Sequence, residues 1–303
     1  MQNRDILWKV ILEEVFEDFL RFMVPEAEKV FDFKRGFEFL DKELAEMYPE
    51  PGRETATRLV DKLVKAFRRS GKEEWLLIHI EVQGETTRRA QFAERMFRYF
   101  YRIFDRYRRP VTGIAIFTGQ DGRKMPGCFR YEFLHSRLEY RYNTMCILDF
   151  TDKELEESDN PFAVVALVAK KGLVKKSDDQ LMAEKLKIVR LLYKKGFDKR
   201  KIAAILLFLK NYLQFAKPQI ERIFEKGIDQ ITSKKNPMGI IEYFTQEARK
   251  EARKEAEIRT SKIEKERFVK ALLKNSEFSQ TKIASLTDVS VAFVRKVKKN
   301  LAL

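Results

Sequence analysis

Two carboxylates and one amide lie in stretches that are otherwise apolar, and they are the chain's strongest candidates for chemistry. Asp61 stands within LVDKLV, and Glu81 stands within IHIEVQ, two positions before Gln83. An isolated carboxylate in an apolar environment is costly, so each of the two must be paired, protonated or bound to a cation. Glu81 and Gln83 share one face of a predicted strand because side chains alternate, whereas Val82 points to the other face.

A short turn predicts that the two carboxylates meet. Residues 57–68 and 74–83 have the apolar character of strands, and Ser70-Gly71 is the turn between them. Paired residues of an antiparallel hairpin have numbers with a constant sum, which a tight loop here fixes at about 141–143. Asp61 is then expected opposite Glu81, within one residue of register.

The predicted pair of carboxylates suits a divalent cation. Two carboxylates held close together in an apolar sheet repel each other unless a cation lies between them. Hard oxygen ligands favour Mg²⁺, with Mn²⁺ or Ca²⁺ as alternatives, and water on such a metal could attack a phosphodiester. The structural alternative is that Asp61 pairs with Arg58 or Lys62, and that Glu81 pairs with an arginine of the next helix.

Five short motifs follow one another in the first 160 residues. They are Asp5-Ile6-Leu7-Trp8-Lys9, Phe39-Leu40-Asp41, Leu59-Val60-Asp61-Lys62-Leu63, Ile80-Glu81-Val82-Gln83 and Arg95-Met96-Phe97-Arg98-Tyr99. In order and spacing the motifs resemble the Rpn family of recombination-promoting nucleases, also described as transposases, within the PD-(D/E)XK nuclease superfamily. The resemblance implies a restriction-endonuclease-like core and a Mg²⁺-dependent DNA endonuclease that hydrolyses phosphodiester bonds.

The resemblance also implies a role for each residue of the site. Asp61 and Glu81 hold the metal, with the backbone carbonyl of Val82 as a third ligand, and Gln83 positions the attacking water. Gln83 stands where the superfamily has Lys, and it stabilises a phosphorane less because it carries no positive charge. A catalytically weak or inactive protein that keeps the fold and acts in DNA binding or as a scaffold is therefore the alternative.

Three further residues are accessory in this interpretation. Asp41 is an outer acidic residue of the site. Arg95 and Tyr99 lie one helical turn apart and face either the site or the phosphate. The alternative for Arg95 and Tyr99 is packing of their helix against the sheet.

The elements that must position these residues predict an α/β domain over residues 1–160. A helix over residues 5–24 precedes the hairpin. The elements expected after the hairpin are a helix over 86–108, a buried strand over 111–118 and two strands near 128–134 and 138–148. This order indicates a mixed central sheet flanked by helices.

The rest of the chain is predicted to be all-α. Residues 161–238 form a helical region, 239–274 a long charged helix and 275–303 a helix-turn-helix. The helices expected in the first of these regions cover 162–172, 178–195, 198–213 and 217–230. Residues 1–169 have a net charge of −2 and residues 170–303 a net charge of +17, which attracts polyanions, nucleic acid first. A highly soluble helical tail is the other interpretation of this charge.

Two basic surfaces are candidates for DNA contact. On the helix over 86–108, Arg88, Arg95, Arg102 and Arg106 lie on roughly one side, and arginine among aromatic residues suits phosphate contact. The alternative is a solvated face above a core of Phe92, Met96, Phe100 and Phe104. On the last helix the outward cations are Arg295, Lys296, Lys298 and Lys299.

The helix-turn-helix prediction depends on two serine caps. Ser279 and Ser290 each precede an amphipathic stretch, and the second of these has Val291, Val294 and Val297 on its inner side. The second helix of such a motif enters the major groove of DNA. The alternative is a helical cap that packs on the chain or contacts another subunit.

Composition excludes several other classes. The chain has only two cysteines, Cys128 and Cys146, which argues against a disulfide-stabilised scaffold and against a zinc finger. Both cysteines are expected in the core. No apolar run approaches the ~20 residues of a membrane span, and the amphipathic start does not read as a signal peptide. We expect a cytoplasmic protein that has DNA as its partner and no membrane contact, and that is compatible with a homodimer.

Overall fold

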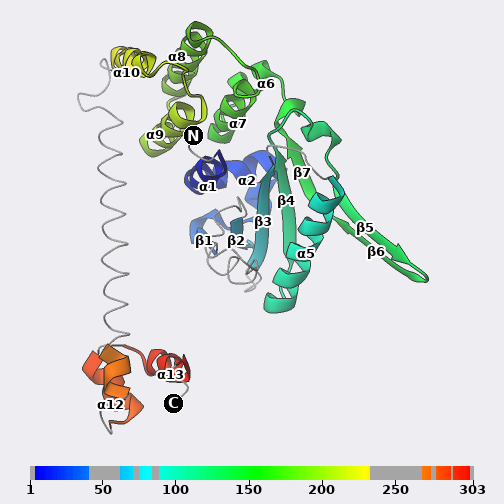
Figure 1. The fold of residues 1–303 in the computed structure, drawn as a ribbon, viewed down its shortest axis with the longest axis vertical. Coiled ribbons are helices and arrows are strands. Elements are labelled where there is room, and N and C mark those ends of the chain that lie inside the picture. Colours follow the sequence, from blue (N-terminus) through cyan, green and yellow to red (C-terminus); the bar gives the residue numbers. More distant parts are fainter. Residues whose placement is uncertain are drawn as a thin grey trace. The chain divides into compact units, whose positions relative to one another are not determined.

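The chain is a mixed α/β protein, and its computed structural model divides it into two compact units, residues 1–237 and 238–303 (Figure 1). The residues that the structure describes are 4–40, 62–70, 75–83, 89–232, 268–273, 278–287 and 289–300. For residues 75–83 it describes the backbone alone.

The first unit is built on a five-stranded mixed sheet of order β1-β2-β3-β4-β7. Its strands are β1 (Phe37–Phe39), β2 (Lys62–Phe67), β3 (Trp75–Gln83), β4 (Val111–Phe117) and β7 (Asn143–Cys146). β1, β2 and β3 pair antiparallel, whereas β4 pairs parallel with both β3 and β7. The parallel β3–β4 pair needs a crossover, and helix α5 (Arg89–Tyr107) supplies it.

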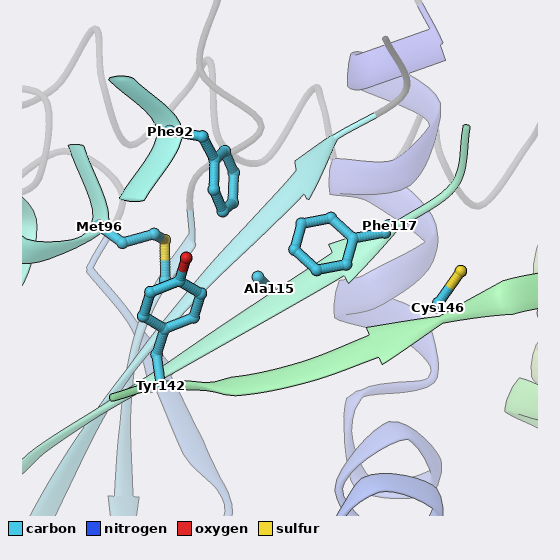
Figure 2. Close-up of a cluster of buried hydrophobic side chains, with 6 residues drawn as sticks. All are labelled: Phe92, Met96, Ala115, Phe117, Tyr142 and Cys146. Atoms are coloured by element: carbon cyan, nitrogen blue, oxygen red, sulfur yellow. The ribbon is translucent and has the colours of Figure 1, made fainter. Parts of the chain in front are cut away.

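Helix α5 covers one face of the sheet. Its buried residues recur at helical spacing, and Phe92 and Met96 pack on Ala115 and Phe117 of β4. Figure 2 shows this cluster, in which the rings of Phe92 and Phe117 lie 5.4 Å apart in an edge-on arrangement. Further along the helix, Tyr99 packs against Leu63 of β2.

Two N-terminal helices cover the opposite face. They are α1 (Arg4–Glu14) and α2 (Phe16–Met23), followed by the short α3 (Ala27–Val30). The ring of Phe16 meets the rings of Phe37 and Phe39 on β1 at centroid distances of 4.8 and 5.4 Å. The prediction of a single helix over 5–24 is corrected to two helices. They are separated at Val15, whose φ of −120° and ψ of 29° are not helical.

A helical layer packs on α1 and α2. It consists of α6 (Asp152–Glu157), α7 (Pro161–Lys171), α8 (Asp178–Lys195), α9 (Lys199–Tyr212) and α10 (Pro218–Thr232). Every residue of α7 from Pro161 to Ala169 is buried, and Asn160 caps its start by accepting a hydrogen bond from the N–H of Phe162 at 2.8 Å. Among the described helices, none is both long and apolar enough to cross a membrane.

The predicted elements are confirmed at most positions, with four corrections. The predicted helices over 86–108, 162–172, 178–195, 198–213 and 217–230 correspond to α5, α7, α8, α9 and α10, and the strands over 74–83 and 111–118 correspond to β3 and β4. The predicted strand over 57–68 is described from Lys62 onward.

Besides the interruption of the first helix, the prediction for Phe104 as a core residue is wrong, because its side chain is 41% exposed. Ile103 and Tyr107 of the same part of α5 pack toward Leu63 of β2, whereas Phe104 lies on another side of the helix and stacks on Phe100. Cys146 is buried as predicted, whereas Cys128 is only partly buried.

The prediction of one strand over 138–148 is also wrong. These residues form β6 (Ser136–Arg141) and β7, and β6 pairs with β5 (Cys128–Phe133) in a separate two-stranded sheet. Tyr142 separates the two strands, and its hydroxyl donates to the carbonyl of Pro126 at 2.6 Å. The apolar alternation runs on through this residue, so the sequence did not reveal the change of sheet.

The second unit contains the two helices of the predicted helix-turn-helix. They are α12 (Gln280–Thr287) and α13 (Val291–Asn300), and residues 268–273 are also helical. Ser279 and Ser290 accept hydrogen bonds from backbone N–H groups three residues on, both at 3.2 Å, so both serine caps are confirmed. Val294 and Val297 are buried beside Ile283. Most of the predicted helix over 239–274 lies outside the described residues.

A glycine of β4 makes room for a tyrosine. An added Cβ at Gly113 would lie 2.5 Å from the hydroxyl oxygen of Tyr140 and 3.2 Å from Cε of Met96. The Tyr140 hydroxyl is buried with no hydrogen-bond partner among the described residues, and this burial raises the pKa of Tyr140. Only a residue without a side chain fits at position 113.

The variant Gly113→Ala is therefore expected to lower the free energy of unfolding by about 1–3 kcal/mol, the scale of overpacking in a core. Tyr140→Phe removes the nearest atom and breaks no hydrogen bond of the described residues, so alone it should be near neutral. Urea unfolding of the two single variants and the double variant measures their coupling. If Gly113→Ala loses as much stability with Phe at position 140 as with Tyr, the hydroxyl is not the obstacle.

Candidate functional site

The predicted catalytic residues belong to the β2–β3 hairpin. Every described pair of this hairpin, from Lys62 with Ile80 to Phe67 with Trp75, has residue numbers that add up to 142. The predicted register is therefore confirmed for the described pairs. Asp61 lies outside the described residues, so its pairing with Glu81 stays a prediction.

Glu81, Val82 and Gln83 form the end of β3, the central strand of the sheet. In the parallel ladder with β4, Glu81 is the register partner of Ala115, and Gln83 is that of Phe117. The side chains of Glu81 and Gln83 lie outside the described part of the chain, as do Asp41 and Arg88. The structure thus gives the place of this segment in the sheet and leaves its side-chain roles as predictions.

The two accessory residues of α5 lie on or beside its sheet-facing side. Tyr99 is buried in a cluster with Leu63 and Ile103, so it packs the helix against β2. Arg95 is half-buried one turn earlier, and its guanidinium carbon lies 5.4 Å from the ring centroid of Phe92. The contacts of Tyr99 are those that the packing alternative predicts. Arg95 is a cation at the edge of the same interface between helix and sheet.

The remaining arginines of α5 that the structure describes are exposed. Arg102 and Arg106 follow Arg95 at spacings of seven and four residues, so the three lie on one flank of the helix. The guanidinium carbon of Arg106 lies 5.6 Å from the ring centroid of Tyr107. This flank of α5 is therefore basic.

Sequence reasoning missed a buried cation on β2. Lys62 is fully buried, forms an ion pair with Glu13 of α1, and has its Nζ 4.9 Å from the ring centroid of Phe39. From the sequence, Lys62 is expected only as a partner for Asp61. Its partner on α1 is 49 positions away and half-exposed, so nothing in the local pattern indicated it. The one signal was a lysine among apolar strand residues.

In the second unit the basic face of α13 is described in part. Arg295 is exposed and Lys298 is half-exposed, whereas the side chains of Lys296 and Lys299 lie outside the described residues. On the neighbouring α12, Lys282 is exposed as well. The described part of α13 therefore has buried valines on one side and cations on the other, as the sequence predicted.

No metal site is formed by the side chains that the structure describes: they include no group of three or more His, Cys, Asp or Glu residues that could hold an ion. The two predicted ligands, Asp61 and Glu81, are not among those side chains. In the comparisons with known proteins, no family model matches the chain, and no curated protein or solved structure matches it. The assignment of a function therefore depends on the residues of the chain itself.

A second buried cation lies in the helical layer. Lys185 of α8 is fully buried between the rings of Phe215 and Phe224, with Nζ 4.2 and 4.3 Å from their centroids. Its Nζ donates to the carbonyl of Leu213 at 2.9 Å and lies 3.8 Å from a carboxylate oxygen of Glu221. Burial lowers the pKa of Lys185 to about 8, against the opposing effect of Glu221. Because Lys185 is enclosed and hydrogen-bonded, it ties α8 to the loop before α10 and has no access to a substrate.

This buried lysine predicts an unusual dependence of stability on pH. The pKa of Lys185 is lowered from 10.5 in the unfolded chain to about 8 in the folded chain. Between these values the unfolded chain binds a proton that the folded chain has lost, so the free energy of unfolding rises with pH in this window. Urea unfolding at several pH values should show this rise in the wild type relative to Lys185→Met. Lys187→Met, which removes an exposed lysine of the same helix, is the control and should follow the wild type. A constant difference between wild type and Lys185→Met would contradict the lowered pKa.

Proposed function

We propose that the chain is a metal-dependent DNA endonuclease of the PD-(D/E)XK type, similar to the Rpn recombination-promoting nucleases. The observation that supports this best is the register of the β2–β3 hairpin, on which the predicted meeting of Asp61 and Glu81 depends. In this proposal the mixed sheet, with α5 on one face and α1 and α2 on the other, is the restriction-endonuclease-like core.

The proposed site lies at the end of β3. Asp61 and Glu81 would hold Mg²⁺, or Mn²⁺ or Ca²⁺ in its place, with the carbonyl of Val82 as a third ligand. When bound, the ion lowers the pKa of a coordinated water and neutralises charge on the phosphate. Gln83 orients the attacking water through its amide group. The proposal requires the Glu81 carboxylate on the face that α5 covers, the face to which its register partner Ala115 points.

The basic flank of α5 is the proposed contact for the DNA backbone near this site. Arg95, Arg102 and Arg106 are described on this flank, and Arg88 precedes them in the sequence. Arginine donates two parallel hydrogen bonds to a phosphate, which fixes the position of the strand to be cut. Arg95 is the best placed of the three to reach the scissile phosphate, because it lies at the edge of the helix–sheet interface.

The second unit is proposed to bind DNA independently of the site. Its two capped helices resemble a helix-turn-helix, and α13 would enter the major groove with Arg295 and Lys298 toward phosphates or bases. One observation favours the alternative function of a DNA-binding or scaffold protein with little activity. Gln83 supplies no positive charge where the superfamily has Lys, so binding without cleavage is the outcome that would support this alternative.

Plasmid cleavage tests the proposed site. The wild type should nick or cut DNA with Mg²⁺ and not with EDTA, and Asp61→Asn or Glu81→Gln should lower the rate by ~10²-fold or more, the scale of losing one group that stabilises a transition state. Mg²⁺ should also raise the Tm of the wild type and not that of Asp61→Asn, because a ligand that binds the native state stabilises it.

One control variant and one variant of the proposed site make this experiment specific. Asp105→Asn removes an exposed carboxylate of α5, one that pairs with Arg108, and should cleave as the wild type does. Gln83→Lys restores the residue type of the superfamily and should preserve or raise the rate. Equal cleavage by the wild type and Asp61→Asn would overturn the proposed site, and DNA binding without any cleavage would support the scaffold alternative.

The salt dependence of DNA affinity tests the second unit. Arg295→Glu with Lys298→Glu should weaken DNA binding and lower the slope of log affinity against log salt by about 2, because each phosphate contact contributes about 0.9. Fluorescence anisotropy at several salt concentrations measures both. Lys282→Glu, on the exposed side of α12, is the matched control and should change the slope less. An unchanged slope in the double variant would exclude α13 from the DNA contact.

A further inference from the structure

The β5–β6 hairpin projects from the first unit as a ribbon of its own (Figure 1). Its base is held by α5, where Phe129 stacks on Phe97 at 5.0 Å and Tyr140 stacks on Phe100 at 4.5 Å. The outer half has no such support among the described residues. The most exposed apolar side chains there are those of Tyr131 (53%), Phe133 (63%) and Leu134 (80%).

This outer half is unstable by itself on general grounds. An isolated two-stranded ribbon is marginally stable in water, and each of its strands leaves one edge of backbone N–H and C=O groups unpaired. The tip is also strained, because Leu134 has a left-handed φ of 51° that branched and bulky residues rarely adopt. A partner that pairs with one edge and covers the apolar face would remove these disadvantages.

The charged face of the ribbon has a regular pattern. Across the ladder Arg130 faces Glu139, and Glu132 faces Arg137. Glu139 accepts hydrogen bonds from Arg141 at 2.5 Å and from Arg130 at 2.9 Å, and these lower the pKa of Glu139. Arg137 is exposed and forms no ion pair within the described ranges. One cation on β6 is thus available to a carboxylate from outside the ribbon.

The outer edge of β6 is complementary to itself. If two copies of β6 pair antiparallel about a twofold axis at Leu138, Arg137 of each copy stands opposite Glu139 of the second copy. The row across the four strands then reads Glu132, Arg137, Glu139 of the second copy and Arg130 of the second copy, so that opposite charges alternate. Opposite charges directly across antiparallel strands stabilise a sheet, and like charges destabilise it.

The same pairing also continues the apolar face. Leu138 is the register partner of Tyr131 and lies on the face opposite the charges. With the axis at Leu138, the apolar row runs from Tyr131 through the two copies of Leu138 to Tyr131 of the second copy. The sheet of this hairpin has only the strands β5 and β6, so the outer edge of β6 has no strand paired with it among the described residues.

We propose that the β6 edge is a homodimer interface, in which two hairpins join into one four-stranded antiparallel ribbon about Leu138. The charged face carries both signs, with Arg130, Arg137 and Arg141 beside Glu132 and Glu139. A second copy satisfies both signs, whereas DNA would place phosphates beside the two glutamates. The proposal depends on the register, the charges and the apolar face of this hairpin, and it is independent of the proposed nuclease activity.

Disulfide trapping tests the axis. In the full chain with Cys128→Ser, the variant Leu138→Cys should form a cross-linked dimer under mild oxidation, because residues directly opposite have Cα atoms ~4.5–5.5 Å apart and a disulfide needs ~4.4–6.8 Å. Ser136→Cys is the matched control on the same strand. Its two copies would lie four residues apart along the ribbon, roughly 13 Å, and should not cross-link. Equal cross-linking of both variants, or of neither, would overturn the proposal, and cross-linking of Tyr131→Cys alone would move the interface to β5.

Charge complementation tests the pairing without cysteines. Arg137→Glu and Glu139→Arg should each weaken the dimer roughly 10-fold or more, since like charges then face each other in two rows. A mixture of the two variants should recover association, because position 137 of one variant then faces an opposite charge at position 139 of the other.

Sedimentation velocity at tens of micromolar measures the association of each variant and of the mixture. A wild type that stays monomeric, or a mixture that associates no better than its components, would overturn the proposal. A loss of DNA affinity with no change in the oligomeric state would assign the hairpin to nucleic acid instead.

Discussion

The structure of the first unit depends on the register of β3, the central strand of the sheet, which pairs with β2 on one side and with β4 on the other. Its antiparallel pairing with β2 and its parallel pairing with β4 are coupled, because a slip of one residue would turn every side chain of the strand to the opposite face. The two faces are not interchangeable. Leu63 of β2 belongs to the cluster under α5, whereas its neighbour Lys62 pairs with Glu13 of α1.

The N-terminal helices have to satisfy two layers at once. On the sheet side Phe16 meets β1, and on the helical side Trp8 meets the ring of Phe208 of α9 at 5.5 Å. The carboxylates of these two helices also form ion pairs with both layers. Glu13 pairs with the sheet, whereas Asp18 pairs with Lys201 of α9 at 2.7 Å. α1 and α2 therefore form the middle layer of the unit, and their position is determined from both sides.

Much of this arrangement could be predicted from sequence, because its signals are local. Apolar runs and a turn predicted the β2–β3 hairpin and its register, and the two serine caps predicted where α12 and α13 begin. The sequence could not indicate that β6 and β7 belong to different sheets. The apolar alternation continues through Tyr142, and only tertiary contacts interrupt the strand there. For the same reason the partner of Lys62 on a distant helix was missed. For the candidate site, the strand that carries Glu81 and its register were predictable, because both follow from local apolar runs and the turn between them.

The middle position of α1 and α2 has a consequence for the order in which the chain can fold during synthesis. Asn160, at the start of α7, donates to the backbone carbonyl of Asp18 across 142 positions of sequence, and Arg200 of α9 reaches Glu14 across 186. At ~5–20 residues per second, a ribosome needs roughly 10–40 s to add that much chain. During this interval the nascent chain presents Trp8 and Phe19 without the helices that later cover them. The opening of the chain is thus a segment that chaperones are able to bind, and the unit reaches its final packing only after the helical layer has left the ribosome.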